Sequence, residues 1–287
     1  MRARTPVDRD KLDSVQGRMG FARRSPDEKA LAVVAPSPGY DFPKVVYDVT
    51  IRNMRPVVDE LSFEKEGFII LRHELSCLNE RDPDLLSKKY LEEMVPLLKD
   101  YFKASWVQTA DLGGINLRSL GGEGFFTRPT DDTKSGIRKT GTSHAHIDYS
   151  PVGGPMIAAR DCQLQGIEIR AYSRLMIIQA WQALSPPPQD HPLTFCDAGS
   201  IEAGDLVEVD YRGHGVTHKS WALRHNPSHR WYYLPDMTHD EIYLFKGYDS
   251  ADHHHRWSAH STFENRGAYP DAKPRASIES RFFVYYE

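Results

Sequence analysis

The sequence predicts a mainly β protein with supporting helices, in which antiparallel strands form a jelly-roll core. Two observations lead to this fold class. The second half of the chain consists of short apolar runs separated by Gly, Pro and Asp, which is typical of a closed or sandwiched antiparallel sheet. Residues 83–104 follow a helical period instead, so we expect a long helix to buttress the core.

The first hundred residues predict a lead-in, two strands and this helix. Residues 1–40 are polar with scattered Arg, Asp and Pro, and we expect them to be loosely structured. The runs at 44–52 and 66–74 are rich in β-branched and aromatic residues, which favours strands. The helix at 83–104 should be broken locally near Pro96. Its apolar face repeats every fourth residue and is formed by Leu86, Tyr90, Met94, Leu98 and Phe102.

A second helix is predicted at 154–174, and strands follow it to the C-terminus. The chain shows no internal repeat and no linker-like tract, so residues 41–287 are predicted to form a single domain. Bulky aromatic residues such as Trp231, Tyr232 and Tyr233 are expected to fill its interior. The predicted strands cover residues 175–184, 193–197, 205–212, 230–235, 241–249, 258–264 and 277–286.

Composition excludes several classes of protein. A net charge of -4 without a basic stripe makes nucleic acid an improbable partner. The sequence contains no apolar run approaching the roughly 18 residues that a membrane span needs. Its first residues are charged where a signal peptide would be apolar, so we expect a cytoplasmic protein. Cys77, Cys162 and Cys196 are widely spaced and are expected to be reduced thiols.

Residues 141–151, GTSHAHIDYSP, place His144, His146 and Asp148 at every second position. In a strand, side chains two residues apart share one face, so these three groups would point the same way. Two imidazoles and a carboxylate on one side of an ion leave coordination positions open, as in non-haem iron(II) oxygenases. The alternative is an exposed strand edge that carries polar groups, and His-x-Asp alone does not decide between them.

A third ligand is expected far along the chain, and His260 is the best candidate. It lies in the strand-like run 258–264, and in a jelly roll the last two strands return beside the first. His144 is expected to line the cavity, although it could also be a ligand, and His255 in a polar turn is the next candidate. Surface loops are the expected place of His214, His218, His225, His229 and His239.

The terminal strand carries a second group of polar residues. Arg275, Ser277 and Arg281 fall at odd positions and would share one face of this strand. A guanidinium pairs bidentately with a carboxylate, and a nearby hydroxyl adds a hydrogen bond, so this face could seat a dicarboxylate such as 2-oxoglutarate. A surface ion pair, with Glu279 or Glu264, is the alternative for either arginine.

Asn116 and Arg118 alternate on a further predicted strand that precedes the His-x-Asp segment. They could bind a carboxylate of the substrate, and a structural salt bridge is the alternative for Arg118. The glycines and charges of residues 121–141 suit a lid that closes over the mouth of the site.

Five blocks of the sequence resemble the bacterial and fungal family of iron(II)/2-oxoglutarate oxygenases that includes the cephamycin hydroxylase CmcJ and the gibberellin desaturases. The blocks are HIDYSP, QAWQALSPPPQDHPLTFCD, RWYYLPDMTHDEIYLFKGYDS, AHSTFEN and PRASIESRFFVYY. The resemblance covers residues 140–287, and the third block is its most specific part. Where many members read Asn-Val-Trp-Arg, this sequence has Gln179, Ala180, Trp181 and Gln182.

The resemblance implies a cupin-like double-stranded β-helix in which His146, Asp148 and His260 hold iron(II). It implies that arginine on the last strand, Arg275 with Arg281 as a second candidate, holds 2-oxoglutarate as the co-substrate. The expected reaction uses O2 to hydroxylate, desaturate or close a ring at an unactivated C–H bond of a small molecule of specialised metabolism. The residues leave two other functions open: an iron oxidase that uses no 2-oxoglutarate, and a non-catalytic jelly-roll binding protein.

Overall fold

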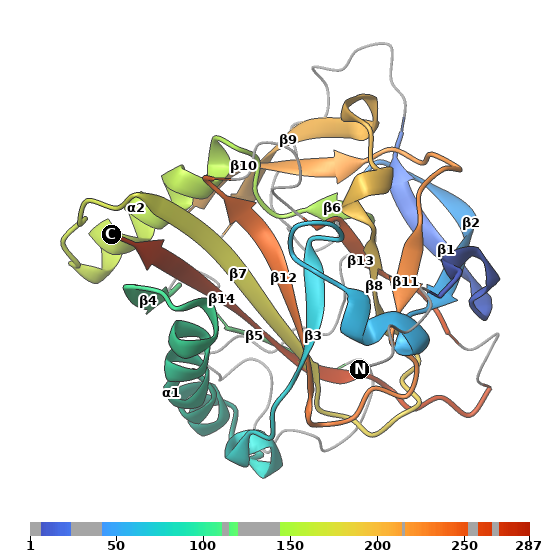
Figure 1. Ribbon diagram of the computed structural model, residues 1–287, viewed down its shortest axis with the longest axis horizontal. Coiled ribbons are helices and arrows are strands. Elements are labelled where there is room, and N and C mark those ends of the chain that lie inside the picture. Colours follow the sequence, from blue (N-terminus) through green and yellow to red (C-terminus); the bar gives the residue numbers. More distant parts are fainter. Residues whose placement is uncertain are drawn as a thin grey trace, which may run out of the picture.

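The computed structural model describes residues 7–23, 42–110, 115–119, 144–213, 216–251, 258–265 and 270–287 (Figure 1). In this part of the chain most of the regular structure lies in two mainly antiparallel sheets, and two α-helices pack against them. The mainly β class with supporting helices is therefore confirmed. The predicted lid at 121–141 and the alternative ligand His255 lie outside the described residues.

The larger sheet has eight described strands in the order β1-β2-β11-β8-β13-β6-β10-β9. Its neighbours are far apart in the sequence, since β6 lies between β13 and β10, and β8 lies between β11 and β13 (Figure 1). This order places two short segments, β6 and β13, side by side in the middle of the sheet. The strands are β1 Ser14–Ala22, β2 Lys44–Asn53, β6 His146–Ile147, β8 Leu193–Cys196, β9 Leu206–Gly213, β10 Val216–Leu223, β11 Trp231–Tyr233 and β13 His260–Thr262.

The smaller sheet has the order β3-β12-β7-β14-β4, and β5 also pairs with β14. The long strand β14 is central, because it pairs with β7 along one edge and with β5 and then β4 along the other. One face of this sheet looks toward the larger sheet, where Phe245 of β12 packs against Phe195 of β8 with ring centroids 5.0 Å apart. The strands are β3 Phe68–Arg72, β4 Trp106–Thr109, β5 Ile115–Ser119, β7 Arg174–Ala183, β12 Glu241–Asp249 and β14 Ala276–Tyr286.

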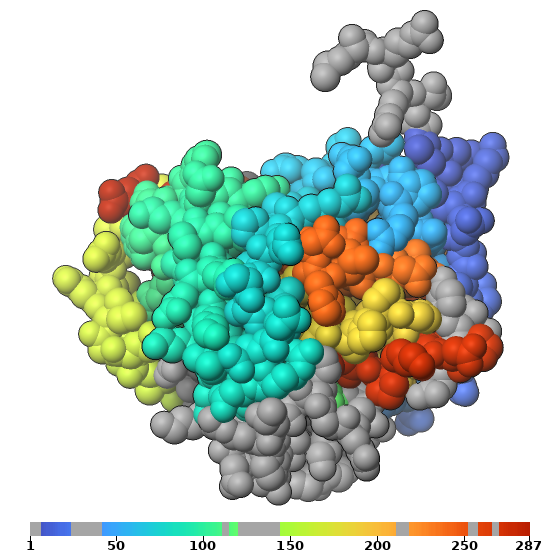
Figure 2. Space-filling model, turned by 90° about the horizontal axis from the view of Figure 1, so that it is seen from below, coloured from blue at the N-terminus to red at the C-terminus, as the bar shows by residue number. Residues whose placement is uncertain are grey.

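Helix α1, Pro83–Phe102, covers the outside of the smaller sheet and packs on β4 and β14 (Figures 1 and 2). The Asp82 side chain caps its N-terminus by accepting hydrogen bonds from the backbone of Asp84 and Leu85, and Pro83 follows where a missing N–H costs nothing. The predicted break near Pro96 is wrong, since the helix continues through this residue. The buried stripe that holds it to the sheet is formed by Leu86, Tyr90, Met94 and Leu98.

Helix α2, Gly153–Gln165, is shorter than the predicted 154–174. It ends because Gly166 takes a left-handed conformation with φ 64°, where its N–H caps carbonyls of the last turn. At its start, a Cβ on Gly153 would lie 2.1 Å from the carbonyl oxygen of Lys219. Only glycine therefore permits α2 to approach β10 this closely.

Three strands, β1, β4 and β10, lie where the sequence predicts none. Part of the expected lead-in forms β1, which pairs with β2 and buries Met19 and Phe21. Strand β10 contains His218 in a stretch that the sequence assigns to a loop. Short 3-10 helices link the strands at η1 Arg9–Lys11, η3 Arg55–Glu60, η4 Ser76–Asn79, η5 Ala198–Ser200 and η6 Ala203–Asp205. No helix within the described ranges is long and apolar enough to cross a membrane.

Candidate metal centre

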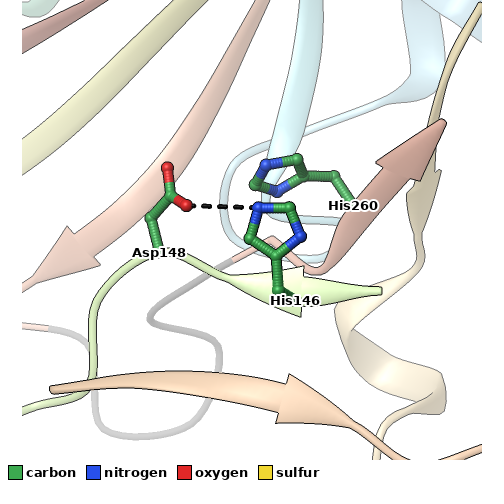
Figure 3. Close-up of side chains that lie close together, drawn as sticks. All are labelled: His146, Asp148 and His260. Carbon is green, nitrogen blue, oxygen red and sulfur yellow. Dashed lines mark ion pairs between the residues drawn. The ribbon is translucent and has the colours of Figure 1, made fainter. Parts of the chain in front are cut away.

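Two histidines face each other across neighbouring strands of the larger sheet. His146 of β6 is the direct antiparallel partner of His260 of β13, and their ring centroids lie 4.3 Å apart. The pairing of the strands therefore fixes the two side chains on the same face of the sheet. Figure 3 shows both imidazoles beside the carboxylate of Asp148, which follows β6 in the chain.

Asp148 completes a cluster of three possible metal ligands. Its Oδ1 lies 3.3 Å from Nε2 of His146. One ligand atom from each of His146, Asp148 and His260 lies within 4.8 Å of the other two. The structure thus brings together the three residues that the sequence analysis groups; we call them the ligand cluster.

The hydrogen bonds of the two imidazoles determine which ring nitrogen is available to a metal. Nδ1 of His146 lies 2.9 Å from the carbonyl oxygen of His144, and Nδ1 of His260 lies 3.1 Å from that of Ser258. A carbonyl oxygen only accepts, so each Nδ1 must carry the proton. In a neutral ring the other nitrogen, Nε2, then offers its lone pair to the centre of the cluster.

Burial sets the charge of the cluster. Burial, together with the nearby His146, lowers the pKa of His260 to about 4, so this ring is neutral at neutral pH. Burial alone would raise the pKa of Asp148, but the charge of Arg281 outweighs it and holds this pKa well below its usual range. Two imidazoles and one carboxylate are the donor set that the sequence predicts for iron(II).

The second oxygen of Asp148 is occupied by two donors from the smaller sheet. Nε2 of Gln179 on β7 donates to Oδ2 over 2.6 Å, and a terminal nitrogen of Arg281 on β14 donates over 2.8 Å. Glu279, also on β14, lies 2.6 Å from the same guanidinium nitrogen. One oxygen of the Asp148 carboxylate therefore faces the ligand cluster, and the other belongs to a polar network with the smaller sheet.

Arg275 directly precedes β14, and Ser277 lies on the same face of this strand as Glu279 and Arg281. Arg275 is 1% exposed, and its guanidinium donates to the carbonyl oxygen of His191 over 2.6 Å and lies 5.7 Å from the Trp181 ring. Its Nε and the hydroxyl of Ser277 have no hydrogen-bond partner among the described residues. Burial and the charge of Arg118 lower the pKa of Arg275 to about 9. A carboxylate from outside the chain would satisfy these donors.

Asn116 and Arg118 belong to β5, and they lie opposite Glu279 and Ser277 of β14 respectively. Asn116 is buried, and the charge of Arg118 acts on both Glu279 and Arg275. Residues paired in register share a face of the sheet. Both therefore lie on the face of β14 that reaches the ligand cluster.

The remaining predicted histidines fall in different places. His144 is not part of the ligand cluster; its ring stacks on Phe42 at 3.9 Å and lies 5.3 Å from the ring of His146. The surface-loop prediction is wrong for His218 and for His229. His218 lies on β10, where Nε2 is 3.2 Å from the carbonyl oxygen of Asp148, and His229 is 6% exposed and bound to Asp205.

Gln179 and Glu279 are the site residues that sequence reasoning missed. Glu279 is 7% exposed, not part of a surface ion pair as one alternative suggested. A signal for it exists, because Glu279 continues the spacing of two residues that relates Arg275, Ser277 and Arg281. Gln179 is a polar residue inside the apolar run 175–184. Gln182, three residues on, points to the opposite face of β7 and donates to the carbonyl oxygen of His239.

This fold and this cluster agree with what comparison with known families finds. The chain belongs to the family described as the oxidoreductase/YMDC permease-like domain, whose model matches residues 19–285. It is 29% identical over 254 residues to the hydroxylase/desaturase efuI of Hormonema carpetanum, which covers 83% of each chain. It is 25% identical over 262 residues to the Fe(II)/2-oxoglutarate-dependent dioxygenase nvfI of Aspergillus novofumigatus, which covers 88% of this chain and 89% of the other.

Solved structures show the same fold. The iron and alpha-ketoglutarate-dependent endoperoxidase NvfI superimposes with a TM-score of 0.74 over 95% of this chain and 98% of its own, at 23% sequence identity. A second structure of NvfI, in a different conformation, gives a TM-score of 0.75 at 24% identity. The jelly-roll fold predicted from the sequence is therefore confirmed.

Proposed function

We propose that this protein is an iron(II)/2-oxoglutarate-dependent oxygenase that acts on an unactivated C–H bond of a small molecule. One observation carries the proposal: Asp148 joins the ligand cluster to β14 through Arg281, and Arg275, which directly precedes β14, is buried without a carboxylate partner among the described residues. Relatives named as hydroxylase/desaturase and as a dioxygenase support the same reaction class. Hydroxylation, desaturation and ring closure all fit it.

In this proposal His146, Asp148 and His260 hold iron(II). The donor set fits, since both rings offer Nε2 and the carboxylate offers Oδ1. Iron(II), with O2 and 2-oxoglutarate, supplies the oxidising power when bound, and the chain supplies ligation, orientation and a dry cavity. The substrate is proposed to be a small molecule of specialised metabolism, and the cytoplasm its place of action.

Arg275 and Ser277 are proposed to bind the distal carboxylate of 2-oxoglutarate. Arg281 is the weaker candidate for this role, because two carboxylates of the protein already flank it. Asn116 and Arg118 are proposed to face the substrate from β5. Residues 41–287 are proposed to form the catalytic domain, to which β1 adds one edge strand of the larger sheet.

The test is an anaerobic titration of the metal-free protein with iron(II) and then 2-oxoglutarate. We expect one equivalent of iron(II) to bind, and a weak visible charge-transfer band to appear when 2-oxoglutarate joins the complex. His146→Ala, Asp148→Ala and His260→Ala should each abolish iron binding while the far-ultraviolet circular dichroism of the fold is kept. If the protein binds no iron(II), the proposal fails; if it binds iron(II) but not 2-oxoglutarate, an oxidase without this co-substrate takes its place.

A further inference from the structure

The two oxygens of Asp148 have different surroundings. Oδ1 faces the cluster, 3.3 Å from Nε2 of His146. Oδ2 accepts hydrogen bonds from Gln179 at 2.6 Å and from Arg281 at 2.8 Å. A carboxylate whose second oxygen already accepts two short hydrogen bonds has one oxygen left to offer a metal.

The donors come from the opposite sheet and are themselves held in place. Gln179 and Arg281 are direct partners in the pairing of β7 with β14, so they reach Asp148 from neighbouring positions on one face. Glu279 also lies 2.6 Å from the guanidinium nitrogen of Arg281 that donates to Asp148. Gly247 of β12 leaves the room that Gln179 occupies, since a Cβ there would lie 2.7 Å from Oε1 of Gln179.

We infer that Gln179 and Arg281 are positioning residues that turn Asp148 so that Oδ1 alone binds the metal. The inference rests on the proposed function, because it assumes that the ligand cluster takes up iron(II). It assigns Arg281 to the metal end of the site, and it leaves Arg275 as the guanidinium available to the co-substrate. A single-oxygen carboxylate ligand keeps one more position on the metal open to other ligands.

Gln179 gives the sharper test of the two because it is neutral. Replacing it changes the hydrogen bond to Oδ2 without changing the charge near the metal. Its Oε1 is buried and has no hydrogen-bond partner among the described residues, so the amide is poorly satisfied where it lies. For the fold alone, an apolar side chain would suit this buried position at least as well as the poorly satisfied amide. We therefore expect Gln179→Leu to keep the stability of the metal-free protein.

The experiment measures iron(II) dissociation constants anaerobically for the parent, Gln179→Leu, Arg281→Lys and a control, Gln182→Leu. Gln182 is the same residue type on the same strand, but it lies on the opposite face and bonds to the backbone of His239. Removing a hydrogen-bond partner of a metal ligand typically costs about 10- to 100-fold in metal affinity, and we expect this for Gln179→Leu and Arg281→Lys. Gln182→Leu should bind iron(II) as the parent does.

The melting temperature of each metal-free variant and the charge-transfer band with 2-oxoglutarate are recorded beside the affinities. We expect Gln179→Leu to melt at or above the parent temperature and its band to shift, because the coordination of Asp148 changes. Iron(II) affinities of Gln179→Leu and Arg281→Lys equal to or above that of the parent overturn the inference while the proposed function stands. A parent protein that binds no iron(II) overturns both.

Discussion

Two arginines, Arg281 on β14 and Arg275 directly before this strand, lie in opposite electrostatic surroundings. Arg281 lies between Asp148 and Glu279; burial alone would lower its pKa, but these carboxylates raise it well above the ordinary value. Among the described residues, the guanidinium of Arg275 contacts a backbone carbonyl and an aromatic ring but no carboxylate, and burial with Arg118 lowers its pKa to about 9. The same side chain is thus stabilised as a cation at one position and poorly solvated at the other.

From this difference we expect different roles: Arg281 stabilises the fold, and Arg275 binds a ligand. A largely buried guanidinium paired with two carboxylates belongs to an internal ion-pair network, which links β14 to the ligand cluster. A buried guanidinium without a carboxylate partner among the described residues costs free energy in the metal-free protein, and this cost is recovered when an anion binds. The following predictions test this separation, from the largest expected effect to the smallest.

Replacing Arg281 should damage the fold. Arg281→Met removes the cation beside Asp148 and Glu279 and leaves these two largely buried carboxylates without it. Breaking a buried ion pair on one side typically costs about 3–5 kcal/mol, and we expect a loss of that size in the free energy of unfolding. Urea unfolding of the metal-free protein measures it. A loss below about 1 kcal/mol would show that this network does not stabilise the fold.

Replacing Arg275 should damage the binding of the co-substrate instead. Losing a charged partner in a desolvated site typically costs about 2–5 kcal/mol, so Arg275→Ala should raise the dissociation constant of 2-oxoglutarate about 30-fold to several thousand-fold. Iron(II) affinity should stay that of the parent, because Arg275 does not contact the ligand cluster. Arg275→Lys should restore only part of the affinity, since an ammonium keeps the charge but lacks the planar fork.

Calorimetric titration of the anaerobic iron complexes with 2-oxoglutarate gives these constants. Unchanged binding in Arg275→Ala would mean that the co-substrate does not reach this end of β14. If Arg281→Lys then showed the large loss of 2-oxoglutarate affinity at unchanged iron(II) affinity, the roles of the two arginines would be exchanged.

The matched stability experiment is Arg275→Met. No carboxylate of the described residues loses a partner in this variant, although the carbonyl of His191 loses one hydrogen bond. Replacing a buried charge by an apolar side chain of similar volume is often neutral or stabilising, so the free energy of unfolding should change by less than about 1 kcal/mol. Urea unfolding beside Arg281→Met provides the comparison. Equal destabilisation of both variants would contradict the distinction between the two arginines.

A smaller effect is expected from a buried pair far from β14. Nε2 of His229 lies 3.0 Å from Oδ2 of Asp205, yet burial outweighs this partner and lowers the pKa of His229 below 6.5. The unfolded chain therefore takes up this proton first, and the free energy of unfolding should fall as pH drops below the unfolded pKa near 6.5. The decline should be weaker in His229→Gln, measured by urea unfolding at several pH values. Parallel curves for the two proteins would contradict this assignment.

Much of the fold could be predicted because local sequence determines it. The apolar runs that become β7, β12 and β14 and the helical period of α1 depend on nearest neighbours along the chain. Strands β1 and β10 were missed because their sequences are polar, and pairing with distant strands makes them regular. The end of α2 depends on one glycine, which the pattern of apolar residues does not mark.

The residues of the candidate site also differ in how far the sequence alone predicts them. His146 and Asp148 could be grouped from their spacing alone, whereas the choice of His260 needed an expected topology, since strand order is a tertiary property. Glu279 and Gln179 were not predicted because sequence does not show how deeply a polar residue is buried. Their roles become visible only when β7 and β14 face the larger sheet. That the ligand cluster binds a metal stays a prediction.

The pairing of His146 with His260 has a consequence for how such proteins can diverge. The two side chains meet because β6 and β13 are adjacent strands in a fixed register, and the long stretch of chain between them does not set their separation. Insertions or deletions in the loops of that stretch can therefore accumulate without moving either histidine, as long as the pairing of β6 and β13 with each other and with their neighbours is kept. A shift of one residue in the ladder would turn one histidine to the other side of the sheet. Relatives of this protein can thus vary in loop length and in the molecule that they accept, and the few backbone hydrogen bonds around β6 and β13 must be inherited unchanged.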